Sequence, residues 1–483
     1  MSKEKVKDCI IIIFGASGDL SLNKLIPSIF NLYLNGFLSE KKYAVLAISR
    51  SIFKNSEFKI KVKKNLISLY PNALDKIHSF LKYIFYEPLD LEKFSSYKIL
   101  NNKLSELRAI YKIRNNLLFY FSISPALYSK VSYYMGCSGL NEQKDGYKRI
   151  AIEKPFGFDW KSALDLNNHL LKYYKPSQIF RVDHYLGKKM VRNLLAFRML
   201  NKKFEPIWNR NFIKNVKIFA NETSGLGARG SYYDTNGGAI KDMIQSHLLQ
   251  LLAVIAMDKP AKFNSYSVQE EFLKVIKSIK LFKSLEDVKN NVILAQYEDG
   301  VFQKKKLKAY RREYNIPSNS LTETFALIRL NIENGRWGKV PFFLQTGKRL
   351  SQKIVQIQVN FNVNILEKYH IPNLDPQIRT NKLIINIYPK SNFEINLLTK
   401  SGEKTIELTN LFNIKNSLKE YLYKDYDFLI SNIIEGNHNM FVTIDQVLAC
   451  WNIVDPIFLF IKDFRQEILK FYPCGSDTLC LQI

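Results

Sequence analysis

The stretch Cys9–Leu20, CIIIIFGASGDL, decides the fold of the first half of this 483-residue chain. An unbroken apolar run that ends in glycines is typical of a strand buried on both faces and followed by a tight turn. Gly15 and Gly18 would let that turn approach a pyrophosphate closely, and a helix after it would offer free amides and the positive end of its dipole. The motif is GxxG and not the full GxGxxG, so taken alone it also fits an ordinary strand-to-helix turn.

Strand-like and helix-like segments continue to alternate up to about residue 185. Lys24–Leu34 has the periodicity of an amphipathic helix, and further strands are predicted at YAVLAIS, NLLFYFSIS and RIAIEKPFG. Strands that alternate with helices form parallel sheets with both faces covered. We therefore predict a Rossmann-like, dinucleotide-binding α/β domain over residues 1–185.

The pattern changes in the second half of the chain. VKIFANET, KIVQIQVNF, KLIINIYP and FEINLL predict strands, several of them with no helix in between. Gly238–Met257 predicts one long, largely buried helix. We therefore expect a larger α+β domain over residues 186–483, with a mainly antiparallel sheet backed by helices.

The end of the second predicted strand favours NADP over NAD. In NAD-binding folds an acidic side chain at this point accepts hydrogen bonds from the ribose hydroxyls, whereas YAVLAISRS ends on Ser49, Arg50 and Ser51. An arginine there suits the 2′-phosphate of NADP. A solvated surface arginine is the alternative.

Composition restricts the class of protein. Hydrophobic residues at 46% and charged residues at 24% are typical of a globular protein, and we find no apolar run of the roughly 18 residues that a membrane span needs. The N-terminal MSKEKVKD shows no signal peptide. We therefore expect a cytoplasmic protein. We also expect no structural metal, because no CxxC pair or metal-ligand spacing exists among Cys9, Cys137, Cys450, Cys474 and Cys480.

The formal net charge of +27 has two interpretations. A strongly basic field attracts nucleic acids and other polyanions. However, the lysines are spread along the chain, and no zinc finger, RNP-type or helix-turn-helix signature accompanies them. We favour compositional drift and expect neither nucleic acid nor membrane as a partner, although a phosphorylated small substrate would benefit from the field.

The motif EKPFG, Glu153–Gly157, places a lysine where ligands bind in a doubly wound sheet. It follows a predicted strand, and ligands in such sheets lie beyond the carboxyl ends of the strands. Lys154 would therefore point into the cleft. A surface lysine on a turn is the alternative.

RVDHYLGKK, Arg181–Lys189, crowds ionisable groups around one glycine. A second histidine, His247, lies among leucines in DMIQSHLLQ, and a buried imidazole needs a partner. A carboxylate such as Asp183 would orient it and raise its basicity, as for a general base. Asp242 lies five residues before His247, about 140° around a regular α-helix.

The chain resembles the glucose-6-phosphate dehydrogenase family in the order and spacing of its motifs, from about residue 9 to about residue 460. These motifs are FGASGDL, EKPFG, RVDHYLGK, NLLAFR, FEPIWNRN, DMIQSHLLQ, TETFA, VPFFLQTGKRL and DPI. The resemblance implies oxidation of β-D-glucose 6-phosphate at C1 to 6-phosphogluconolactone with hydride transfer to NADP, the first step of the oxidative pentose phosphate pathway. It also implies a homodimer or homotetramer.

The same resemblance implies a role for each site residue. His247 would take the proton of the C1 hydroxyl, and Asp183 would stabilise the imidazolium. The substrate-binding residues would be His184, Tyr185, Lys188, Lys154, Glu222, Asp242, Lys348 and Lys353. The cofactor site would comprise Gly15, Ser17, Gly18, Asp19, Leu20, Arg50 and Lys154, with Lys24 nearby. No metal is needed, because the ring oxygen already polarises the carbonyl that forms.

Two alternatives remain open at this point. The same motifs fit a hexose-6-phosphate dehydrogenase with broader sugar specificity or with both NAD and NADP as cofactors. A non-catalytic, basic nucleic-acid-binding protein on the same fold is supported by the net charge alone.

Overall fold

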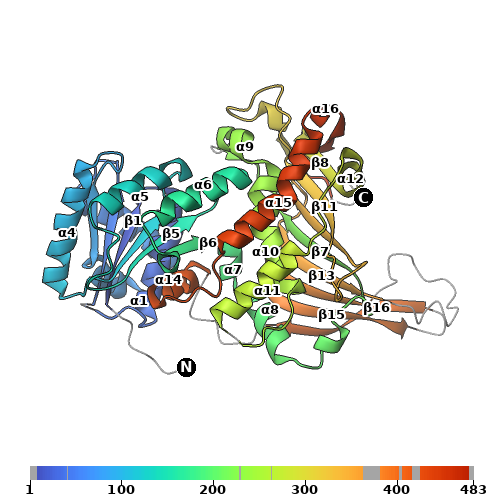
Figure 1. Cartoon of the computed structure of the whole chain (residues 1–483), viewed down its shortest axis with the longest axis horizontal. Helices are drawn as coiled ribbons and strands as arrows, with labels where there is room; N and C mark the ends of the chain where they lie inside the picture. Colours follow the sequence, from blue (N-terminus) through green and yellow to red (C-terminus); the bar gives the residue numbers. More distant parts are fainter. Residues whose placement is uncertain are drawn as a thin grey trace.

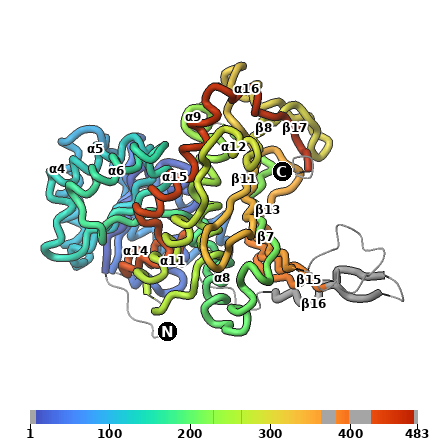
Figure 2. The backbone as a smooth tube through the Cα atoms, turned by 45° about the vertical axis from the view of Figure 1, so that its right-hand side comes forward, coloured from blue at the N-terminus to red at the C-terminus, as the bar shows by residue number. Residues whose placement is uncertain are grey.

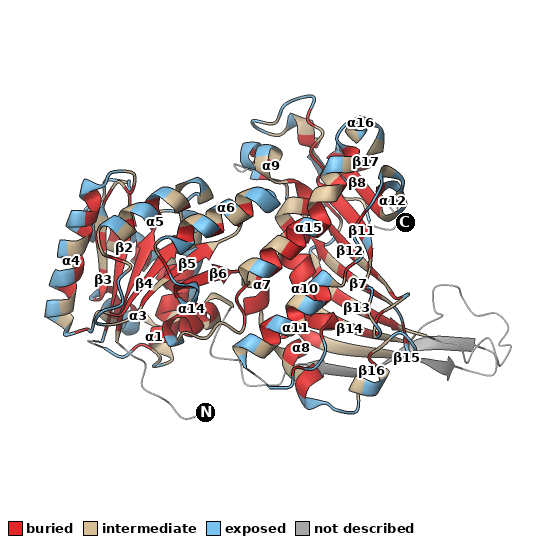
Figure 3. Cartoon of the chain, viewed as in Figure 1, coloured by how far each residue is buried: buried red, intermediate tan, exposed pale blue. Residues whose placement is uncertain are grey.

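The computed structural model describes residues 8–40, 42–227, 230–262, 264–362, 381–401, 405–415 and 425–477. Cys480 and most of MSKEKVKD lie outside these ranges. Two sheets dominate the fold, one in each half of the chain, and helices pack between and around them (Figure 1). The central strands of the first sheet are buried throughout, whereas those of the second sheet alternate buried and less buried residues (Figure 3).

The first sheet has six parallel strands in the order β3-β2-β1-β4-β5-β6. This is the order of the dinucleotide-binding Rossmann fold, so the predicted fold is confirmed. The residues of β1, β2 and β4 are buried throughout, because helices cover both faces. The strands are β1 (Cys9–Phe14), β2 (Tyr43–Ser49), β3 (Ile84–Pro88), β4 (Leu117–Phe121), β5 (Lys148–Glu153) and β6 (Ile179–Val182).

Alternate side chains of β1 enter two separate hydrophobic clusters. Ile10 and Ile12 pack with α4 and α5 on one face, and Ile11 and Ile13 pack with α1 and α2 on the other. The predicted helix at Lys24–Leu34 is present, with a wider first turn, η1. The helices of this half are η1 (Ser21–Leu25), α1 (Ile26–Leu34), α2 (Asn55–Leu69), α3 (Leu74–Leu81), α4 (Ser95–Tyr111), α5 (Tyr128–Cys137) and α6 (Trp160–Leu171).

The second sheet has nine strands in the order β16-β15-β14-β13-β7-β12-β11-β8-β17. Among the described strands of this second sheet, only the pairs β7–β12 and β8–β17 are parallel. The expectation of a mainly antiparallel sheet is therefore confirmed. The strands are β7 (Ile213–Asn221), β8 (Val292–Glu298), β11 (Phe325–Asn331), β12 (Pro341–Gly347), β13 (Ile354–Phe361), β14 (Lys382–Tyr388), β15 (Asn392–Ser401), β16 (Thr405–Lys415) and β17 (Leu469–Pro473).

Helices back this sheet on the side that faces the first half (Figures 1 and 2). The helices of this half are α7 (His184–Gly187), α8 (Lys189–Leu200), α9 (Gly230–Asn236), η6 (Ile240–Leu248), α10 (Leu249–Ala256), α11 (Ser265–Lys277), α12 (Leu285–Asn291), α15 (Ile444–Ile461) and α16 (Arg465–Ile468), and α14 (Asp425–Glu435) packs elsewhere. The boundary at residue 185 stays a prediction.

The predicted long helix at Gly238–Met257 is present over residues 238–256 but differs in its geometry. Its first part, η6, is a π-helix, and only α10 is a regular α-helix. In a π-helix hydrogen bonds join residues five apart, so such residues lie nearly above one another. The expected separation of about 140° between Asp242 and His247 was therefore wrong, because it assumed α-helical geometry.

By length and composition alone, α15 is apolar enough to cross a membrane, with a mean hydropathy of 1.5. The bent pair of α9 and η6–α10 also passes if it is counted as one segment. The sequence was expected to hold no uninterrupted apolar run of about 18 residues, and Asp445 and Asp455 interrupt the apolar residues of α15. Half of the α15 segment is buried inside the protein, and the helix contacts α6, α11, α12 and η6. This packing accounts for its apolar residues as those of a core helix.

Helix α14 belongs to the second half of the sequence but packs on the first sheet. It lies beside α1 (Figure 1), and Leu429 and Ile433 join the hydrophobic cluster of β1 and α1. Arg149 on β5 donates hydrogen bonds to the carbonyls of Ile433 and Ile434, at 2.7 and 2.5 Å. Residues far apart in sequence therefore share one core.

The same helix explains the glycine in DHYLGK. A Cβ atom on Gly187 would lie 2.8 Å from Leu429 Cδ1 and 2.9 Å from the Asp425 carbonyl oxygen. Both distances are below normal van der Waals contact. Gly187 is thus required for the close approach of α7 to α14.

Truncating Leu429 should destabilise the protein. Its side chain is fully buried, so Leu429→Ala should lower the free energy of unfolding by about 2–5 kcal/mol in urea denaturation. Leu459 on α15 is 70% exposed and provides the control, since Leu459→Ala should change it by less than about 0.5 kcal/mol. An unchanged urea midpoint for Leu429→Ala would contradict the role of α14 in this core.

Candidate active site

Asp183 and His247 form a buried pair where the two halves of the chain meet. Asp183 follows β6 and caps α7, because its Oδ1 accepts a hydrogen bond from the Tyr185 N–H at 2.9 Å. The same oxygen lies 2.6 Å from Nδ1 of His247 on η6. The two side chains are 2% and 1% exposed. Their predicted proximity is therefore present in the structure.

Electrostatics sets the protonation of this pair. Burial raises the pKa of Asp183, but the charge and hydrogen bond of His247 outweigh it and bring the pKa to about 2. Burial lowers the pKa of His247 below its ordinary value, against the opposing effect of Asp183. At neutral pH Asp183 is ionised and His247 is neutral. Since a carboxylate can only accept, Nδ1 carries the proton and Nε2 keeps a lone pair, as a general base requires.

Two further residues of DHYLGK pack against the base. The Tyr185 ring stacks on His247 with centroids 4.2 Å apart, and the His184 ring lies edge-on at 4.6 Å. Burial and the charge of His247 hold the pKa of His184 well below its ordinary value. Asp183, His184 and His247 also present ligand atoms within 4.8 Å of one another, as a metal site would. That no metal is required stays a prediction.

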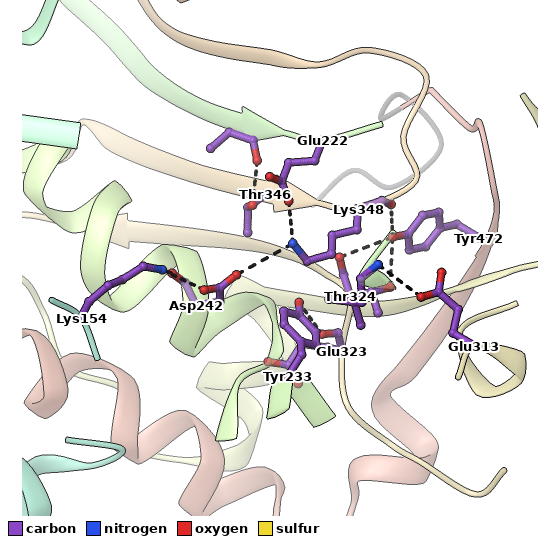
Figure 4. Close-up of polar contacts among 12 residues, drawn as sticks. Lys154, Glu222, Tyr233, Asp242, Glu313, Glu323, Thr324, Thr346, Lys348 and Tyr472 are labelled. Atoms are coloured by element: carbon purple, nitrogen blue, oxygen red, sulfur yellow. Dashed lines mark hydrogen bonds and ion pairs between the residues drawn. The ribbon is translucent and has the colours of Figure 1, made fainter. Parts of the chain in front are cut away.

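A chain of alternating charges lies next to this pair (Figure 4). Lys154 Nζ donates to Asp242 Oδ1 at 2.8 Å, and Lys348 Nζ lies 3.9 Å from Asp242 Oδ2 and 2.5 Å from Glu222 Oε2. Burial raises the pKa of Asp242, but Lys154 and Lys348 outweigh it and hold the pKa below its usual range. Lys154, Asp242 and Lys348 line a cavity of about 270 Å³. Four of the predicted substrate-binding residues are thus in contact.

The remaining predicted substrate residues lie apart from this chain of charges. Lys188 Nζ pairs with Asp425 Oδ2 at 3.3 Å and lies 5.2 Å from the centre of the Tyr185 ring. Lys353 is exposed, does not line the cavity, and places its ammonium 4.9 Å from the centre of the Tyr388 ring. Its proposed contact with substrate stays a prediction.

The glycine turn has the geometry expected for a nucleotide site. Gly15 has φ +81°, and a Cβ atom there would lie 2.0 Å from the Ser122 carbonyl oxygen, so only glycine fits. The Gly18 N–H donates to the Gly15 carbonyl at 3.0 Å and closes the turn. Ser17 Oγ lies 3.2 Å from Ser51 Oγ, which joins the turn to the end of β2.

The outer part of this turn is open to solvent. Gly18, Asp19 and Lys24 are exposed, and Leu20 stands at the start of η1. The Arg50 side chain is 74% exposed, and its guanidinium lies 3.9 Å from the Glu92 carboxylate. The residues present therefore fit a dinucleotide with a negative group near Arg50.

Two acidic residues near the site were not predicted from the sequence. Glu153 Oε1 accepts a hydrogen bond from the Tyr120 hydroxyl at 2.5 Å, and burial raises its pKa to about 7. Its place in EKPFG was a usable signal. Asp425, the partner of Lys188, follows a stretch without any recognised motif. Its position near the site could therefore not be predicted from the sequence.

Family models match nearly the whole chain. The model of the glucose-6-phosphate dehydrogenase NAD binding domain matches residues 12–193, and the model of its C-terminal domain matches residues 195–478. The chain belongs to the glucose-6-phosphate dehydrogenase family. The resemblance inferred from the motifs is confirmed.

Individual relatives agree with this assignment. The glucose-6-phosphate 1-dehydrogenase of Aggregatibacter actinomycetemcomitans is 36% identical over 94% of this chain and 91% of its own length. That of Borreliella burgdorferi is 35% identical over 95% and 93%. A solved structure described as glucose-6-phosphate dehydrogenase in complex with its substrate glucose-6-phosphate has a TM-score of 0.87 at 29% identity, over 99% of this chain and 96% of that one.

The imidazole of His247 should titrate below the ordinary histidine value of about 6.5 in the ligand-free protein, because burial disfavours its charged form. Selective ¹⁵N-histidine labelling and NMR across pH would measure this, with His247→Asn identifying the signal. At neutral pH the shifts should report the Nδ1–H tautomer. A midpoint above about 6.5, or the Nε2–H tautomer, would contradict the electrostatic description of the pair.

Proposed function

We propose that this chain oxidises D-glucose 6-phosphate at C1 to 6-phospho-D-glucono-1,5-lactone, with hydride transfer to NADP. This is the first step of the oxidative pentose phosphate pathway. The observation that carries the proposal is the buried Asp183–His247 pair beside the Lys154–Asp242–Lys348–Glu222 chain of charges. Family membership and the substrate named for the similar solved structure support it.

Proton removal from the C1 hydroxyl is the role of His247. The C1–H bond can release its electron pair to the cofactor only as the O–H electrons form the new carbonyl, so a base must take the hydroxyl proton. Nε2 of His247 accepts it, and Asp183 stabilises the resulting imidazolium through Nδ1. NADP, when bound, supplies the nicotinamide ring that accepts the hydride.

The cationic residues hold the substrate in place. Lys188, with His184 and Tyr185, binds the dianionic phosphate, which is remote from C1 and supplies binding energy that positions the reacting carbon. Phosphate binding would also favour protonation of His184, whose pKa is low without it. Asp242 and Glu222 accept hydrogen bonds from sugar hydroxyls, and Lys154 and Lys348 keep Asp242 ionised by lowering its pKa.

The glycine turn and the end of β2 hold NADP. The backbone of Gly15–Leu20 approaches the pyrophosphate, and the start of η1 offers its free amides. Arg50 binds the 2′-phosphate in place of its exposed contact with Glu92, and β2 is followed by Arg50 and Ser51 instead of the acidic side chain of NAD-binding folds. Lys154 lies between this site and the sugar.

We further propose that the protein acts as a homodimer or homotetramer in the cytoplasm, without nucleic acid or membrane as a partner. One face of the large sheet supports an assembly. Gln356 and Gln358 on β13 and Ile384 on β14 alternate with fully buried residues and are themselves only partly covered. A second copy of the chain would bury this face.

Purified protein should reduce NADP in the presence of glucose 6-phosphate, measured as absorbance at 340 nm, with a higher kcat/KM for NADP than for NAD. His247→Asn should lower kcat about 10²- to 10⁴-fold with little change in KM, because it removes the base and keeps the site's shape. The absence of signal from folded wild-type protein at saturating substrate would contradict the proposed function.

The same assay separates the alternatives. Comparable kcat/KM values for other hexose 6-phosphates would show a broader sugar specificity. A preference for NAD would contradict the role given to Arg50.

A further inference from the structure

Two consecutive residues of η6 bind the turn that carries Lys154. This turn connects β5 to α6 and spans residues 154–159. Lys154 Nζ donates to the carbonyl and the carboxylate of Asp242, at 2.6 and 2.8 Å. At the other end of the turn, Lys241 Nζ donates to the Phe158 carbonyl at 3.0 Å. Asp242 of η6 thus accepts hydrogen bonds from the turn, and its neighbour Lys241 donates a hydrogen bond to the turn.

The ammonium of Lys241 is fixed by contacts other than an ion pair. It lies 5.0 Å from the centre of the Phe458 ring and 5.9 Å from that of Trp451, both on α15. Among the described residues no carboxylate lies within ion-pair distance of it. A cation over aromatic rings is attracted to their negative faces, but this attraction fixes no donor direction. The bond to Phe158 is therefore the directional contact of this side chain.

The turn has little freedom elsewhere. Gly157 has φ +83°, and a Cβ atom there would lie 2.4 Å from the Ala163 nitrogen. The first amide of α6, that of Trp160, donates to Asp455 Oδ2 on α15 at 2.8 Å. Since the start of α6 is already tied to the second half, the contact of Lys241 determines how the preceding residues of the turn sit on η6.

We infer that Lys241 is a positioning residue that fixes the β5–α6 turn on η6 and so places Lys154 relative to the base. His247 belongs to the same helix. The helix η6 therefore fixes the position of the base, and through Lys241 it also fixes the position of the turn. The inference rests on the proposed function for its kinetic consequence. A misplacement of about 1 Å can cost about 100-fold in rate, so the loss should appear in kcat.

The test compares two substitutions at this position. Lys241→Met keeps the aliphatic stem but removes the donor and the charge. It should lower kcat about 10- to 100-fold, change KM for glucose 6-phosphate and NADP less than about threefold, and raise the isotope effect on kcat with substrate deuterated at C1. Lys241→Arg retains a donor and should restore kcat to within about threefold of wild type.

Lys462→Met is the matched control. Both Lys462 and Lys241 line a second cavity of about 360 Å³. Of these two lysines, only Lys241 also lines the cavity of about 270 Å³ that contains Lys154 and Asp242. The control variant should keep the wild-type kcat. A normal kcat in Lys241→Met, or an equal loss in Lys241→Arg, would overturn the inference.

Hydrogen exchange provides a readout that needs no turnover. The Phe158 amide donates to Ser162 Oγ at 2.8 Å, and in Lys241→Met its exchange should be about tenfold faster, because local opening of the turn becomes easier. Unchanged exchange together with a lower kcat would contradict positioning through the turn. If the Phe158 amide exchanges faster in Lys241→Met but the wild-type protein does not oxidise glucose 6-phosphate, the contact is confirmed and the proposed function is rejected.

Discussion

The buried carboxylate of Asp183 is the constraint on which the rest of the site depends. One oxygen of this group caps α7 and contacts His247, while the other is buried without a hydrogen-bond partner among the residues that the structure describes. Burying a carboxylate costs several kcal/mol unless a partner compensates it. Asp183 directly follows the last strand of the first sheet, and His247 comes from the second half of the chain. The pair therefore exists only when the two halves are packed together.

The π-helical geometry of η6 has a consequence for this arrangement. Residues five apart lie nearly above one another, so Asp242 is close enough for its charge to act on His247. Regular α-helical geometry would have turned the two side chains apart. The same helix presents Lys241 and Asp242 to the turn at Lys154. One wide helix thus organises the base, the carboxylate beside it and the contact between the halves, in keeping with the frequent occurrence of π-helical turns at functional sites.

The hydrophobic pattern of single segments predicted both sheets. A strand buried on two faces is apolar at every position, whereas a strand buried on one face alternates apolar and polar residues. CIIIIF, apolar at every position, favoured a fully buried strand, and the alternation in KLIINIYP favoured a half-exposed one. The motifs singled out Asp183 and His247, and the chain of Lys154, Asp242, Lys348 and Glu222, and the structure brings each of these two sets into contact. The π-helix was not predicted, since hydrophobic periodicity does not distinguish its hydrogen bonds from those of an α-helix. The return of α14 to the first sheet, and with it Asp425, depends on which surface an apolar helix covers, and the pattern of one helix does not contain that information.

The coupling between Asp183 and His247 is the most direct test of this account. A double-mutant cycle with Asp183→Asn, His247→Asn and the combined variant, measured as kcat for glucose 6-phosphate and NADP, separates a single functional unit from two independent contributions. If the pair acts as one unit, each single substitution removes most of the rate and the double variant is little worse than His247→Asn alone. Losses that multiply in the double variant would contradict the account.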